Sequence, residues 1–149
     1  MKEISNFFDS FSLNHSNYKN SQLYSNVINL QKNENIPSDI NTIALINFSI
    51  NNDREKFITS LIKLRSYLYS YSNIDKVQIL DCGSFINSVN AKDSIDGLAY
   101  VLSDLITTGI VPIIISDDRS VILAIHKAYE HIKRYYNLAF ILPFIDINN

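Results

Sequence analysis

The chain has 149 residues, with 13 basic and 15 acidic side chains, a formal net charge of −2 and a single cysteine, Cys82. This length suits one domain with a sizeable core and is too short for two ordinary ones. The near balance of charge gives no electrostatic reason to expect binding to nucleic acid or to an anionic membrane. A lone cysteine excludes an internal disulfide and fits a reducing compartment.

The apolar segments of the chain are all short. No run approaches the roughly 20 residues that are needed to span a bilayer. The polar stretch after Met1 lacks the apolar core of a signal peptide. We therefore expect a soluble, cytoplasmic protein.

The first 40 residues show no lasting period of 2 or 3.6 in their apolar positions. They are rich in asparagine and serine, and a Pro-Ser-Asp turn signal at 37–39 closes the segment. We predict an irregular arm over residues 1–40, held by its aromatic side chains against a domain spanning residues 41–149. A partner-binding tail is the alternative. The aromatic residues of the arm are Phe7, Phe8, Phe11, Tyr18 and Tyr24.

From residue 43 onward, short apolar runs alternate with segments of helical period. The runs lie at 43–48, 77–80, 110–115 and 138–142 and predict four strands. Continuous β-branched runs of this kind are typical of strands that are buried on both faces. Because alternation of strand and helix requires crossover connections, we predict an α/β fold of three layers, with a parallel sheet between helices.

Three helices are predicted between these strands, because apolar residues recur there at spacings of four, three and four. We expect the first helix to start at 51–53 and to run to about Tyr71, and Asp93 with Ser94 to cap the second. Gly109 suits the position just after the second helix, where a left-handed backbone is common. The apolar stripes are Phe57, Leu61, Leu64 and Leu68; Ile95, Ala99, Leu102 and Ile106; and Val121, Ile125, Ala128 and Ile132.

A polar corner, Ser-Asp-Asp-Arg-Ser at 116–120, directly follows the third strand. Open α/β sheets bind ligands at the carboxyl ends of their strands, so a functional site is expected here first. Asp117 and Asp118, together with Asp146 after the last strand, offer oxygen ligands to a hard cation such as Mg²⁺. In the structural alternative, one of these aspartates or the last serine caps the next helix, and Arg119 pairs with the other carboxylate.

Two further groups of reactive residue types have structural interpretations. Cys82 has no histidine nearby in the sequence to lower its pKa, so we expect a buried and inert thiol. Asp81 and Gly83 are expected to shape the turn that ends the second strand. His126 and Glu130 are four residues apart and are expected to form a solvated contact on a helix surface, in preference to a metal site.

Several segments carry a resemblance to a known family. They are Ile-Leu-Asp-Cys-Gly at 79–83, Gly-Leu-Ala at 97–99, Gly-Ile-Val-Pro-Ile-Ile-Ile at 109–115 and Ala-Tyr-Glu at 128–130. On these segments, the chain from residue 43 onward resembles the N-terminal half of the arginase/agmatinase/formimidoylglutamase (ureohydrolase) family. It is most similar to the formimidoylglutamase type of Bacteroidetes. The resemblance implies an arginase-like α/β/α fold, two bound manganese ions and hydrolysis of a guanidino or formimino group.

The same resemblance identifies departures from the family's metal-binding pattern. Arg119 stands where the family has a corner histidine, and Ser116 and Asp117 stand where it has paired glycines. Only Asp146 remains of the family's Asp-x-His-x-Asp segment, and the family's later aspartate pair would fall beyond residue 149. An arginine cannot ligate manganese, and its fixed charge repels a cation. One carboxylate cannot hold and bridge two metal ions.

These departures predict a degenerate ureohydrolase-like domain with no catalytic residue, no metal ligand and no cofactor. It would act as a scaffold or interaction module that pairs with itself or with a paralogous subunit, and neither nucleic acid nor a membrane is expected as a partner. One alternative is a fragment or half of a manganese-dependent formimidoylglutamase/arginase-type hydrolase. Another is a small-carboxylate binding module in which Arg119 makes the bidentate contact. Ligand-binding residues, if any, are expected at Asp117, Asp118, Arg119 and Asp146.

Overall fold

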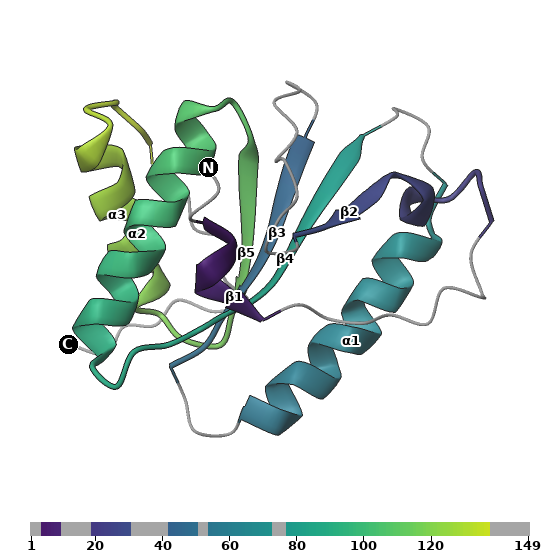
Figure 1. Cartoon of the computed structure of the whole chain (residues 1–149), viewed down its shortest axis with the longest axis horizontal. Helices are drawn as coiled ribbons and strands as arrows, with labels where there is room; N and C mark the ends of the chain where they lie inside the picture. The colour runs from purple at the N-terminus through teal and green to yellow at the C-terminus, as the bar shows by residue number, and fades with distance from the viewer. Residues whose placement is uncertain (1–3, 10–18, 31–41, 51–53, 73–76, 138–149) are drawn as a thin grey trace.

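A computed structural model describes residues 4–9, 19–30, 42–50, 54–72 and 77–137, the side chains of residues 54–57 excepted. These residues form three α-helices and five strands, and strand and α-helix alternate from Thr42 onward (Figure 1). No helix in the described part is both long and apolar enough to cross a membrane. The elements are the 3-10 helix η1 (Ile4–Phe7), β1 (Phe8–Asp9), the 3-10 helix η3 (Leu23–Asn26), β2 (Val27–Asn29), β3 (Thr42–Phe48), α1 (Arg54–Ser70), β4 (Gln78–Phe85), α2 (Ala91–Thr107), β5 (Val111–Ser116) and α3 (Val121–His131).

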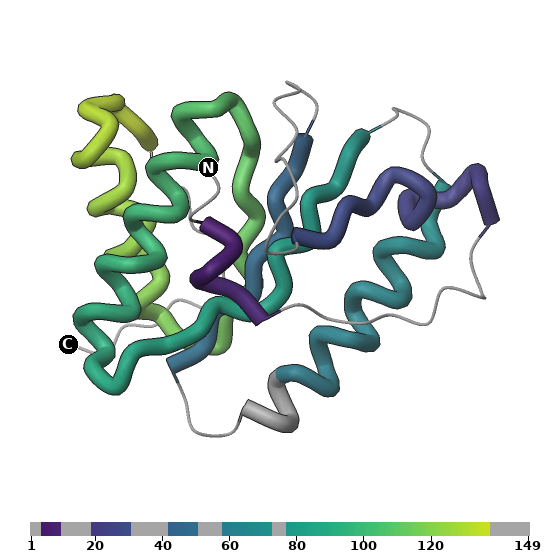
Figure 2. Tube along the Cα trace, in the orientation of Figure 1, coloured from purple at the N-terminus to yellow at the C-terminus, as the bar shows by residue number. Residues whose placement is uncertain are grey.

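The sheet is mixed but mostly parallel. β3 lies in the middle and pairs in parallel with β4 on one side and with β5 on the other. The far edge of β4 is shared by two short strands, β2 running parallel to it and β1 running antiparallel (Figure 2). The predicted parallel arrangement is therefore confirmed for the three longer strands. The strand predicted at 138–142 lies outside the described residues.

The described part of the N-terminal arm has more regular structure than the irregular segment that the sequence predicts. Its strands β1 and β2 use hydrogen-bonding groups that the edge of β4 would otherwise leave unpaired. Phe7 and Phe8 contact the ring of Phe85, with centroid distances of 5.9 and 5.8 Å, and Tyr24 lies against Tyr69. The aromatic side chains thus hold the arm on the domain as expected. The predicted positions Phe11 and Tyr18 lie outside the described residues.

Each face of the sheet has its own apolar cluster. On one face, which we call the α2/α3 face, Ala44, Ile46 and Phe48 of β3 pack with buried residues of α2 and α3. On the opposite α1 face, Leu45 of β3 packs with Tyr69 of α1 and with residues of β2 and β4. Side chains alternate between the two faces because successive residues of a strand point in opposite directions.

The apolar stripes were predicted well for α2 and α3 but not for α1. Leu64 of the predicted α1 stripe is 48% exposed. Among the described side chains of α1, those of residues 58–70, the buried ones are Leu61, Arg65 and Tyr69, spaced four apart, and Arg65 is fully buried. A stripe drawn through apolar residues alone is rotated away from this face, because it treats an arginine as a solvent-facing residue.

Hydrogen bonds to backbone groups define both ends of α2. Its N-cap is Asn90, whose side chain accepts a hydrogen bond from the Lys92 N–H at 2.9 Å, so the helix starts before the predicted Asp93–Ser94 cap. At the other end, Ile110 N–H donates to Leu105 O at 3.0 Å and Gly109 N–H donates to Ile106 O at 3.1 Å. These two bonds form a Schellman motif, which requires the positive φ of 85° that Gly109 adopts.

We expect Gly109→Ala to lower the free energy of unfolding by about 1–2 kcal/mol, because an L side chain is strained at positive φ. No atom lies within 4 Å of the added Cβ, so the loss is conformational. Gly109→Asn should lose less, because asparagine tolerates this conformation better. Urea unfolding of the three proteins measures the difference, and equal stability of the alanine variant and the native chain would contradict it.

Candidate functional site

The order of the parallel strands identifies one place where a ligand site could form. β3 leads into α1 on one face of the sheet, whereas β5 leads into α3 on the other face. Phe48 and Ser116, at the ends of these two strands, are direct neighbours in the sheet. A crevice between adjacent strands whose connections diverge in this way is where open α/β sheets place their ligands. The predicted corner 116–120 is one wall of it.

The corner is closed by its own hydrogen bonds. Asp118 N–H donates to Ser116 Oγ at 3.0 Å, and the Ser116 hydroxyl donates to Asp118 O at 3.1 Å. Asp118 Oδ1 accepts the Ser120 N–H at 2.7 Å and so forms an Asx turn directly before α3, whose N-cap, Ser120, makes no side-chain capping bond. Of the alternatives that the sequence left open, this geometry is nearest to the structural one, with Asp118 holding the turn that leads into α3.

The other predicted ligand residues are not assembled around a common point by the described structure. Asp117 and Arg119 are exposed, and Asp146 lies outside the described residues. Within the described ranges, no three His, Cys, Asp or Glu side chains are grouped closely enough to hold a metal ion. The corner therefore contains one carboxylate that is hydrogen-bonded to the backbone, that of Asp118. Its other two charged side chains, Asp117 and Arg119, are exposed.

Two hydroxyl groups beside the crevice are buried without a hydrogen-bond partner. They are Ser49 Oγ, just after β3, and Ser120 Oγ, just before α3. Burying a hydroxyl without a partner is unfavourable, so such groups call for a bound water or ligand atom. Sequence reasoning missed both, because a serine in a loop carries no signal of its burial.

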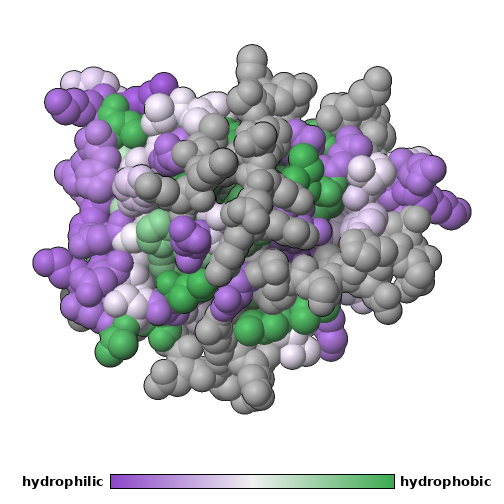
Figure 3. All heavy atoms as spheres, in the orientation of Figure 1, coloured by the Kyte–Doolittle hydropathy of each residue, from purple (hydrophilic) through white to green (hydrophobic). Residues whose placement is uncertain are grey.

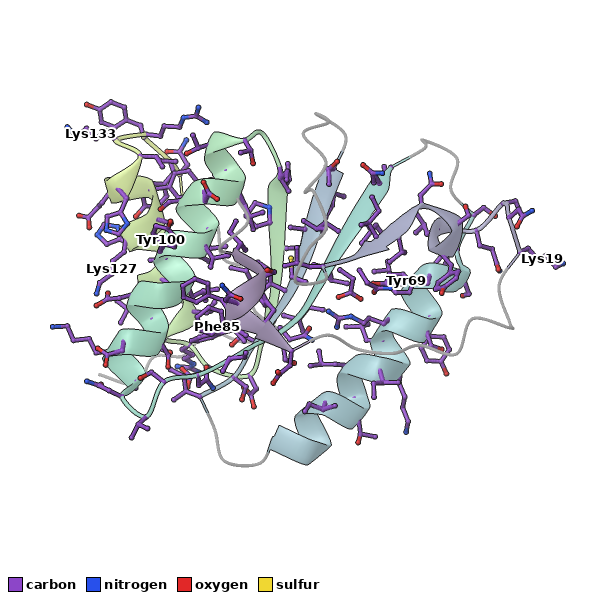
Figure 4. The ribbon with its side chains drawn as sticks, in the orientation of Figure 1. Lys19, Tyr69, Phe85, Tyr100, Lys127 and Lys133 are labelled. Atoms are coloured by element: carbon purple, nitrogen blue, oxygen red, sulfur yellow. The ribbon has the colours of Figure 1, made fainter. Side chains whose placement is uncertain are left out.

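The most extensive polar cluster of the described chain lies on the α1 face and was not predicted. Arg65 Nε and Nη2 donate to the two carboxylate oxygens of Asp81 at 2.8 and 3.0 Å. Arg65 Nη1 donates to Asn47 Oδ1 at 2.8 Å, and the Tyr69 hydroxyl donates to Asp81 Oδ2 at 2.5 Å. In Figure 4, Tyr69 projects from α1 toward the sheet. We call these four residues the Arg65 network.

Asp81 also shapes the backbone of β4. Leu45 of β3 pairs with Asp81 and the next residue of β3 pairs with Gly83, so Cys82 is an extra residue in the strand. Gly83 has φ of 80°, and its N–H donates to Asp81 Oδ1 at 3.0 Å. The expected turn at 81–83 is therefore a β-bulge, and β4 continues to Phe85. Aspartate and glycine are typical of both features, so sequence could not separate them.

The Arg65 network is buried and holds α1 against the sheet through its hydrogen bonds. Arg65 is 0% exposed, and Asp81 accepts four hydrogen bonds through its two oxygens. Burial raises the pKa of Tyr69 above its usual range, and the adjacent Asp81 carboxylate raises it further. The Tyr69 hydroxyl therefore stays protonated as a donor. A substrate has no route to these groups, so we assign them a structural role.

The remaining candidate residues lie where the sequence placed them. Cys82 is fully buried, and burial raises the pKa of its thiol, which keeps it protonated and inert. His126 Nε2 and Glu130 Oε1 are 3.3 Å apart on the surface of α3, both half exposed. The other ring nitrogen of His126 is hydrogen-bonded to the Tyr136 hydroxyl. These contacts confirm a buried cysteine and a solvated His–Glu pair.

Comparisons with known protein families, with curated proteins and with solved structures give no match to this chain.

We expect Tyr69→Phe to lower the free energy of unfolding by about 1.5–3 kcal/mol, because it removes a hydrogen bond to a buried charged group. Asp81→Asn should lose more, about 3–5 kcal/mol, since it leaves the guanidinium of Arg65 buried without its counter-charge. Tyr67→Phe, on the exposed side of the same helix, is the matched control and should change stability little. Similar losses in urea unfolding for Tyr69→Phe and Tyr67→Phe would contradict a structural role for the network.

Proposed function

We propose that this chain is a shortened, arginase-like member of the ureohydrolase type that has lost metallohydrolase activity and serves as a scaffold or interaction module. The observation that supports this most is the corner after β5. Asp118 there is hydrogen-bonded to the backbone of the turn before α3, and Arg119 occupies the place that the resemblance assigns to a metal-binding histidine.

The chemistry of the corner supports the proposal. A two-metal hydrolase needs several anionic or imidazole ligands that converge on a shared water. Here the carboxylate of Asp118 is engaged with the backbone, and the next residue carries a permanent positive charge. A cation that approaches Asp117 and Asp118 would meet the Arg119 guanidinium beside them. We infer that the corner has changed from a metal site into a structural turn.

An interaction role also needs a surface. Two apolar side chains on this side of the sheet are open to solvent. Ile113 of β5 is 45% exposed, and Leu64 of α1 is 48% exposed. Ile113 has the same strand parity as Ile115, which packs with the cluster on the α1 face. In Figure 3 the outer surface over α2 and α3 is mostly hydrophilic. We propose that a second copy of the chain, or a paralogous subunit, covers the apolar residues of the α1 face.

Two other functions remain as alternatives. The chain could be a fragment or half of a manganese-dependent formimidoylglutamase/arginase-type hydrolase, with missing ligands supplied by another segment. It could also be a small-carboxylate binding module with Arg119 as the anchor. The exposed guanidinium of Arg119 suits this last function, because a guanidinium can bind a carboxylate through two parallel hydrogen bonds.

We expect the native chain incubated with Mn²⁺ to hold no stoichiometric metal and to release neither formamide nor urea from formimino or guanidino substrates. Arg119→Ala should alter stability only modestly, as is usual for an exposed charge. Arg119→His restores one ligand type and should still be inactive. Manganese-dependent hydrolysis by the native chain or by this histidine variant would overturn the proposal. A melting temperature raised by a small carboxylate in the native chain, and not in Arg119→Ala, would instead identify the binding module.

We expect the purified chain to form a two-fold dimer at high protein concentration in light scattering. Ile113→Lys should shift the chain toward the monomer, because it places a charge on the proposed contact face. Val89→Lys is the matched control, since Val89 is fully exposed in the loop before α2. A native chain that is strictly monomeric, or an equal effect of the two lysines, would count against this contact surface.

A further inference from the structure

An apolar hollow lies between α2, β5 and α3, on the α2/α3 face of the sheet. Its volume is about 150 Å³. Val111, one of its lining residues, is 57% exposed, so the hollow opens to solvent at the start of β5. The residues that line it are Leu102 and Ile106 of α2, Val111, Pro112 and Ile114 of β5, and Ile125 and Tyr129 of α3.

Contacts between α2 and α3 set the width of the hollow. The two helices lie side by side (Figure 1). The Ser103 hydroxyl of α2 donates to Ala128 O of α3 at 3.2 Å. Lys127 Nζ of α3 donates to Asp96 Oδ1 of α2 at 2.5 Å. These bonds fix the spacing of the helices, so the hollow is not closed by a shift of one helix toward the other.

The side chains around the hollow are also held in place. Ile106, Ile114 and Ile125 pack against the apolar cluster of the α2/α3 face. As β-branched residues they have few rotamers, which hinders their turning into the empty space. The ring of Tyr129 stacks on that of Tyr136, with centroids 4.7 Å apart. The hollow is therefore largely preformed, as small-molecule sites usually are.

The lining indicates the charge of a ligand. Among the described residues that line the hollow, none carries a charge, and their one polar side-chain group is the Tyr129 hydroxyl. A charged ligand would lose its hydration here without gaining a counter-charge. Water is also held poorly, because an ordered water needs two to four polar partners. The hollow therefore favours a neutral and mainly apolar molecule.

The size and the aromatic wall indicate the shape of the ligand. An apolar cavity of this volume can hold a molecule as large as benzene. A ring that meets Tyr129 edge to face, or offset above it, gains an aromatic contact that a saturated ring of the same size lacks. A second fused ring would exceed the space.

We infer that the hollow between α2, β5 and α3 binds a small neutral molecule with one aromatic ring. The inference is independent of the proposed loss of hydrolase activity, and its site is separate from the corner at 116–120. A ligand in the hollow contacts both β5 and α3, the two elements that the corner connects. Its binding therefore stabilises the position of α3 on the sheet.

Methyl NMR of the full-length chain titrated with phenol tests the inference. We expect saturable shifts at Ile106, Ile114 and Ile125, with half-saturation on the order of 1 mM, as suits so small a ligand. Cyclohexanol matches phenol in size without the aromatic ring, and benzoate adds a charge, so both should bind more weakly. Shifts that do not saturate, or that are as large at Ile113 on the opposite face, would overturn the inference. Equal binding of cyclohexanol or of benzoate would overturn the ligand class.

Three variants add a second measurement. Ile114→Phe should fill the hollow and weaken phenol binding by about tenfold or more. Ile113→Phe makes the same change on the α1 face and should leave binding unchanged, so equal effects of the two would refute the site. Ile125→Ala widens the hollow and should let the chain bind the two-ring 2-naphthol at least about tenfold more tightly than the native chain does. If Ile114→Phe does not fold, this gain decides, and its absence refutes the site.

Discussion

The Arg65 guanidinium and the Asp81 carboxylate face each other between α1 and the sheet, with no access to water. Removing two charges from water is costly, and attraction between them offsets the cost only when the geometry is good and the remaining lone pairs are used. Here Tyr69, Asn47 and the Gly83 N–H complete the set. Because these partners come from α1, β3 and β4, any rotation of α1 or slip of β4 would leave a buried charge unpaired.

That constraint separates two groups of polar side chains. Asn47 of β3 and Asp81 of β4 are used inside the Arg65 network, and the bulge at Cys82 accompanies the contact of Asp81 with α1. The polar groups after β5 face a different setting, since Asp117 and Arg119 are exposed and Asp118 holds the start of α3. The side chains of this corner that are open to solvent are therefore Asp117 and Arg119.

Strand–helix alternation from β3 to α3 was predictable, because long apolar runs and helical stripes are strong signals. β1 and β2 were not, since strands of two and three residues have no measurable period and form only where β4 offers an edge. The face of α1 was misjudged because the buried residue is an arginine, whose partner is distant in sequence. The position of the corner was predictable, but its hydrogen bonds were not, because which aspartate bonds to the turn before α3 depends on local backbone geometry.

The shared edge of β4 has a consequence for synthesis of the chain. β1 and β2 leave the ribosome first, yet their partner residues in β4 are about 80 and 50 residues further along. At about 5–20 residues per second, β2 waits several seconds for its partner. During that time Phe7, Phe8 and Tyr24 are exposed with nothing to pack against. The N-terminal segment therefore stays open to aggregation, or to a chaperone, until the edge of β4 that it pairs with has formed.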